Sequence, residues 1–104
     1  MMIVTTDRII GKEVRKTLGV AKGNTIRTRH MGRDIMALFK NIVGGEVQEY
    51  TQLLAQAREQ ALERMKTDAQ SLGANAVIQV RFTTSVLMGG AAEMLAYGTA
   101  VVVE

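Results

Sequence analysis

A long amphipathic helix is the feature that most limits how this chain can fold. Small and apolar residues recur with helical spacing over residues 46–72, about seven turns, and Gly73 follows the last of them. Polar and charged residues occupy the opposite side. The apolar stripe contains Tyr50, Leu53, Leu54, Ala57, Ala61, Met65, Ala69 and Leu72. A stripe of this length has to face a core, so we expect the helix to pack on a sheet of its own chain.

Two strands are expected after the helix, joined by a hairpin connection at Gly89–Gly90. Over residues 75–88 the even positions predict the core face and the odd positions a mostly wet face. The last strand, residues 93–103, is apolar on both faces: Met94, Ala96, Ala100 and Val102 on one, and Leu95, Tyr97, Val101 and Val103 on the other. One helix covers only one side of so small a sheet. The second set is therefore predicted to be an interface with another subunit.

The first part of the chain reads as extended structure. Residues 2–6 form a short β-branched strand, and residues 13–28 form extended structure with a turn at Lys22–Gly23–Asn24 and hence a short hairpin. A short helix over residues 33–45 carries the apolar stripe Ile35, Leu38, Phe39 and Ile42 and ends at Gly44–Gly45. The predicted fold is a single α+β domain over residues 1–104, in two layers and in the order β-β-α-α-β-β, with the long helix on an antiparallel sheet.

Composition excludes several classes of protein. A chain of 104 residues has room for one domain. With no cysteine and one histidine, thiolate zinc sites, iron–sulfur ligation, disulfides and cysteine nucleophiles are absent. No apolar run reaches the length of a membrane span, and the first residues lack the pattern of a signal peptide. We expect a cytoplasmic protein with no membrane association and no resident cofactor.

The charge is concentrated in the first third of the chain. From Arg8 to Arg33 there are eight basic residues and one acidic residue, which suggests contact with a polyanion through Arg15, Lys16, Arg27, Arg29 and Arg33. No aromatic residue lies among them to stack on bases. A solvated sheet face is the favoured interpretation, and nucleic-acid binding is the less favoured one.

His30 and Asp34 are the candidate metal ligands, because imidazole and carboxylate suit first-row metals. A single chain supplies too few ligands, so only symmetry that brings several copies of His30 together could complete a site. The alternative is an exposed loop histidine beside an aspartate that caps the following helix.

Five segments carry a resemblance to a known family: MIVTT at residues 2–6, LGV at 18–20, RDIMALFKNIVGG at 33–45, AREQALERM with LGANAV at 57–77, and YGTAV at 97–101. They resemble the YbjQ-like family, small bacterial and archaeal proteins of unknown function described as heavy-metal-binding. The resemblance implies a dodecin-like subunit assembled as a ring-shaped homopentamer. The chain departs from the family at residues 28–32 and at Gln79 and Arg81, where basic character replaces neutral or acidic residues.

Three hypotheses follow. The first, which we favour, is an oligomeric, ring-shaped binding or scaffold protein without catalytic activity. The second is a heavy-metal-binding protein with ligands shared between subunits, and the third is a polyanion binder. No nucleophile–base pair and no carboxylate dyad is spaced for catalysis, so an enzyme is not expected.

Overall fold

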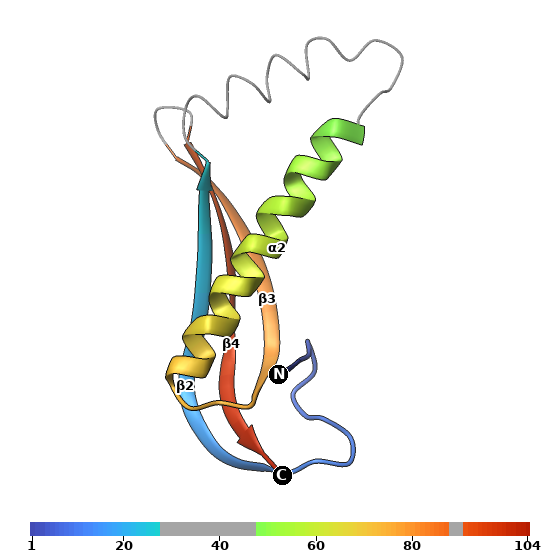
Figure 1. Ribbon diagram of the computed structural model, residues 1–104, viewed down its shortest axis with the longest axis vertical. Helices are drawn as coiled ribbons and strands as arrows, with labels where there is room; N and C mark the ends of the chain where they lie inside the picture. Colours follow the sequence, from blue (N-terminus) through green and yellow to red (C-terminus); the bar gives the residue numbers. More distant parts are fainter. Residues whose placement is uncertain (28–47, 88–90) are drawn as a thin grey trace.

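The computed structural model describes residues 1–27, 48–87 and 91–104. In these residues one helix packs on a four-stranded sheet, an α+β arrangement (Figure 1). The elements are β1 (Met2–Ile3), β2 (Val14–Arg27), α2 (Gln48–Ser71), β3 (Ala76–Leu87) and β4 (Ala91–Val103). The predicted helix at 33–45 and the Gly89–Gly90 connection lie outside the described residues.

The sheet is mixed, with the strand order β1-β3-β4-β2. β4 pairs with β2 and β3 in antiparallel fashion, whereas β1 runs parallel to β3, with Met2 opposite Ala76. The expectation of a purely antiparallel sheet was therefore wrong at β1. Parallel neighbours need a long crossover, and here most of the chain lies between the two strands.

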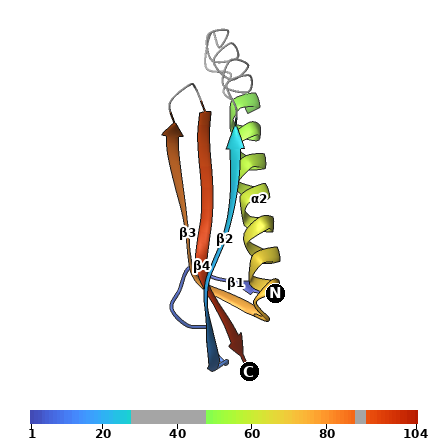
Figure 2. The ribbon, with the colours of Figure 1, turned by 90° about the vertical axis from the view of Figure 1, so that its left-hand side faces the viewer.

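Helix α2 forms the second layer and lies over β2 and β4 (Figure 2). Ala57, Ala61, Met65 and Ala69 of its stripe are buried, as predicted. Leu54 is 37% exposed and Leu72 is 41% exposed, so the prediction that Leu54 is a core residue was wrong. The helix crosses the sheet obliquely, and its first turns extend away from the strands (Figure 1).

Strand β2 is continuous through Gly23, so the predicted turn and short hairpin at Lys22–Gly23–Asn24 were wrong. A methyl group on Gly23 would lie against the backbone nitrogen of Met65 and 2.5 Å from the carbonyl oxygen of Ala61. The glycine is needed because the backbone of α2 passes directly over it. The same helix binds the outer edge of β2. The Asp68 carboxylate accepts a 2.9 Å hydrogen bond from the Lys22 backbone N–H, and Arg64 Nη1 donates a 2.6 Å bond to the Asn24 carbonyl.

A β-bulge at Gln79 changes the alternation of β3. Gln79 has a φ of 52°, and the pairing with β4 shifts between Ile78 and Arg81. As a result Val77 and Val80 both face α2, whereas Ala76 and Ile78 face the opposite side. The extra residue of the bulge reverses the side on which each later residue points. The prediction that the even positions face the helix was therefore correct only after the bulge.

Residues 4–9 form an N-terminal strap that curves round the lower end of the sheet to the side opposite α2 (Figure 2). It is held by backbone hydrogen bonds from Val4 N to Val77 O (3.0 Å), from Val80 N to Val4 O (3.0 Å) and from Gln79 N to Thr6 O (2.9 Å). Ile9 and Val4 of the strap pack in a second core cluster with Ala76, Ile78, Val101 and Val103.

The strap corrects the predicted interface. Val101 and Val103 are 0% and 7% exposed. Their outer face is covered by the chain's own Ile9 and Val4, not left open for another subunit. The sequence pattern could not show this, since the covering residues lie more than ninety positions earlier.

The LGANAV segment joins α2 to β3 and also fastens the end of β4. Gly73 takes a φ of +89° just after the helix, a conformation that glycine adopts without strain. The Asn75 side chain then binds both backbone groups of Val103, accepting from its N–H at 2.8 Å and donating to its carbonyl at 2.9 Å.

Candidate functional site

An apolar surface lies on the face of the sheet opposite α2, above the strap. We call it the far-side surface: Val20 and Ile26 of β2 with Leu95 and Tyr97 of β4. Residues directly paired across antiparallel strands share a face. Lys22 opposite Tyr97, Asn24 opposite Leu95 and Ile26 opposite Glu93 therefore all lie on this side. Val20 is 65% exposed, Ile26 52% and Tyr97 39%, and Leu95 is half-buried.

Three polar side chains around this surface, those of Asn24, Arg81 and Glu93, form hydrogen bonds. Tyr97 lies between Lys22 of β2 and Arg81 of β3. Arg81 Nη1 donates 2.9 Å hydrogen bonds to the carbonyls of Thr5 and Val80, which joins it to the strap. Asn24 Nδ2 donates a 2.9 Å bond to Glu93 Oε2. This arrangement supplies an ordered contact surface and no nucleophile paired with a base.

The sequence prediction identified Leu95 and Tyr97 but missed Val20 and Ile26. Both lie at even positions of β2, beside the predicted turn. Reading residues 20–26 as one uninterrupted strand would have placed Val20, Lys22, Asn24 and Ile26 on one face. The alternation along residues 20–26 therefore identifies this face, but it was overlooked because a turn was predicted at Gly23.

The candidate basic residues are not gathered in one patch within the described chain. Arg15 forms exposed ion pairs with Glu13 (3.0 Å) and Glu104 (3.4 Å). Lys16 and Arg27 lie near opposite ends of β2, about 36 Å apart at the usual rise of a strand. Arg29 and Arg33 lie outside the described residues.

The candidate metal ligands His30 and Asp34 also lie outside the described residues. Within residues 1–27, 48–87 and 91–104, no group of three or more histidine, cysteine, aspartate or glutamate side chains is placed to hold a metal ion. In the same part of the chain, no helix is long and apolar enough to cross a membrane.

Comparisons with known proteins agree with this fold and give the family. A family model described as "putative heavy-metal-binding" matches residues 1–104. The UPF0145 protein of the archaeon Methanosarcina acetivorans is 57% identical over 101 residues, covering 97% of this chain and 95% of that protein. The UPF0145 protein of Dehalococcoides mccartyi strain BAV1 is 55% identical over 104 residues, covering all of both chains.

A solved structure shares the fold at much lower sequence identity. It is a protein of unknown function of the DUF74 family from Pediococcus pentosaceus, with a TM-score of 0.65 and 16% identity, and the match covers 100% of this chain and 98% of that one. This likeness concerns the fold alone. The match of the family model over the whole chain, together with relatives above 50% identity, shows that the chain belongs to the YbjQ-like family of UPF0145 proteins.

Proposed function

We propose that the protein is the subunit of a ring-shaped homo-oligomer that acts as a binding scaffold without catalytic activity. The observation that carries the proposal is the far-side surface, where Val20, Ile26 and Tyr97 are between 39% and 65% exposed on one face of the sheet. Large exposed apolar side chains gathered on one face of a sheet favour a site of association.

We expect the wild-type protein to have a mass near 57 kDa by light scattering, five times 11.3 kDa, with little monomer at micromolar concentration. The number five comes from the family resemblance. Tyr97→Asp should shift the population to smaller species, because it places an unpaired charge in a buried contact. Gln70→Asp, on the exposed side of α2, is the matched control and should keep the wild-type mass. A folded wild-type monomer of 11.3 kDa would contradict the proposed function.

Metal binding is the second candidate function, and the description of the matching family is the observation in its favour. We predict that the chain does not bind a transition metal tightly, since it has no cysteine, one histidine and basic residues at Arg29 and Arg81. Equilibrium dialysis against zinc, copper and nickel should give dissociation constants weaker than about 10 µM, or about 7 kcal/mol of binding free energy. A stoichiometric metal that co-purifies with the protein and is lost in His30→Ala would contradict this prediction.

A further inference from the structure

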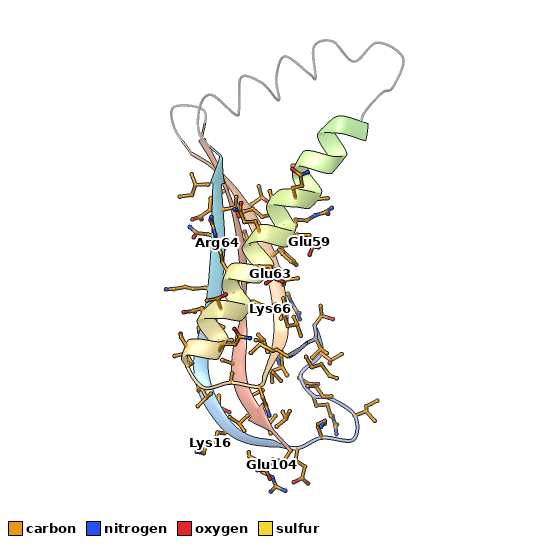
Figure 3. The ribbon with its side chains drawn as sticks, viewed as in Figure 1. Lys16, Glu59, Glu63, Arg64, Lys66 and Glu104 are labelled. Atoms are coloured by element: carbon orange, nitrogen blue, oxygen red, sulfur yellow. The ribbon has the colours of Figure 1, made fainter. Side chains whose placement is uncertain are left out.

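Two charged side chains of α2 bind the outer edge of β2. Among the described residues, β2 is an edge strand whose only sheet partner is β4. The Lys22 N–H points away from β4 and donates a 2.9 Å hydrogen bond to Asp68 Oδ2. The Asn24 carbonyl also points outward and accepts a 2.6 Å bond from Arg64 Nη1. Figure 3 shows Arg64 on the β2 side of the helix and Glu59 on the other side. We call Arg64 and Asp68 the α2 clamp.

The α2 clamp acts where β2 is most regular. The pairing of β2 with β4 shifts register twice before Gly19, and irregularities of this kind disturb an edge as a template for another strand. From Gly19 to Arg27 the pairing is uninterrupted, and Lys22 and Asn24 lie in the middle of this stretch. It is longer than an average strand of about 5–6 residues. A regular edge of this length is one to which another extended chain can add.

The α2 clamp occupies backbone groups that an added strand would need. In an antiparallel ladder, an outward-facing residue gives its neighbour two hydrogen bonds, one from its N–H and one to its carbonyl. The N–H of Lys22 and the carbonyl of Asn24 are already bonded to the clamp. One bond is thus lost at each of two consecutive pairing positions unless both side chains are displaced. Both clamp bonds involve a charged group, and such bonds are roughly twice as strong as neutral ones.

The close approach of α2 to Gly23 brings the α2 clamp within reach of the strand. A methyl group at Gly23 would lie 2.5 Å from the Ala61 carbonyl oxygen, so the helix backbone passes directly over the residue between Lys22 and Asn24. Arg64 and Asp68 are four positions apart, a spacing that allows an ion pair along a helix. Both bind the edge of β2, and no ion pair joins these two described residues to each other.

We propose that the α2 clamp is a block built into the fold, which keeps the β2 edge closed to the addition of another strand. In a solution of the pure protein, the extended chain that can add to an opened edge is the β2 edge of a second copy. Two identical edges can pair in antiparallel fashion about a twofold axis. The inference does not rest on the proposed function, because it concerns a change in mass relative to the wild type, whatever mass the wild type has.

Removal of both clamp side chains tests this proposal. Arg64→Ala/Asp68→Ala leaves the net charge unchanged and should form species of about twice the wild-type mass or more in light scattering as the protein concentration is raised. The wild type should keep its own mass over the same concentrations. Glu63→Ala/Lys66→Ala is the matched control and should also keep the wild-type mass. It removes one acidic and one basic side chain from the same helix, where they form a 3.2 Å ion pair with each other.

A third substitution identifies the surface through which the double variant associates. Lys22→Pro removes the N–H that faces outward, and it breaks no hydrogen bond to β4 because that N–H points to Asp68. Proline at such a position of an edge strand is tolerated and closes the edge to pairing. Adding Lys22→Pro to the double variant should therefore restore the wild-type mass. Association through another surface would persist in this triple variant.

Three results would overturn the proposal: a double variant with the wild-type mass at every concentration, association that persists in the triple variant, or equal association of the control. Hydrogen exchange gives a second measurement, at a concentration too low for association. The Lys22 amide should exchange faster in Asp68→Ala than in the wild type, and an equal rate would also overturn the proposal. Circular dichroism checks the folding of each variant. Asp68→Ala alone replaces the double variant if that protein does not fold, with the same association expected at high concentration.

Discussion

Gly23→Ala should destabilise the protein by about 3 kcal/mol or more, the upper end of the cost of overpacking a core. The added methyl group would lie against the backbone nitrogen of Met65, 2.5 Å from the Ala61 carbonyl oxygen and 2.6 Å from the Arg64 carbonyl carbon. All three atoms belong to the backbone of α2, so no side chain can rotate out of the way. The helix as a whole has to move away from β2.

Urea unfolding followed by circular dichroism measures this cost at a fixed protein concentration, since assembly would change the apparent stability. Thr17→Ala is the control on the same strand, because Thr17 is exposed and its loss should change the unfolding free energy by about 0.5 kcal/mol or less. A Gly23→Ala protein as stable as wild type would show that α2 does not approach β2 this closely.

Met65→Ala should cost about 2–5 kcal/mol of unfolding free energy. Met65 is 0% exposed and packs with Ala21, Ala61, Val77 and Ala100 between the helix and the sheet. The neighbouring residues are small and attached to regular backbone, so they cannot collapse into the space that the side chain leaves. A domain of this size has only about 5–15 kcal/mol of stability to lose.

The matched variant is Met65→Leu, which keeps the volume and should cost less than about 1.5 kcal/mol. The sequence stripe alone assigned a 2–5 kcal/mol loss to Leu54→Ala, but Leu54 is 37% exposed and that estimate belongs to Met65. If Met65→Ala and Met65→Leu lose the same unfolding free energy in this assay, the loss does not come from the cavity that alanine leaves. Such a result would contradict the tight packing around Met65.

Periodicity predicted the long elements within a few residues. The helix expected at 46–72 is Gln48–Ser71, and the strands expected at 75–88 and 93–103 are Ala76–Leu87 and Ala91–Val103. The extended stretch expected at 13–28 is the single strand Val14–Arg27, without the turn that was predicted within it. These elements are predictable because one buried face requires an apolar residue at every turn of a helix or at every second position of a strand. The motifs also identified the family correctly.

What the sequence could not predict depends on contacts between distant segments. Gly23 resembles a turn glycine until the helix above it is known, and Gln79 gives no sign that it takes a left-handed conformation. The burial of Val101 and Val103 depends on Ile9, near the other end of the chain. Of the far-side surface, Leu95 and Tyr97 were predictable from alternation along their own strand, whereas Val20 and Ile26 were missed because a turn was predicted at Gly23. The cytoplasmic location stays a prediction.

The N-terminal strap also determines the order in which the chain can complete its fold. Met2 pairs with Ala76, which is synthesised 74 residues later, and Val4 binds Val77 and Val80. Residues 2–9 therefore have no docking site until β3 has been synthesised, and the cluster around Ile9 is complete only after Val101 and Val103 follow. Closing so long a loop is slow compared with forming a helix or a hairpin. Residues 2–9 are thus synthesised well before the strands they bind and become ordered only after them.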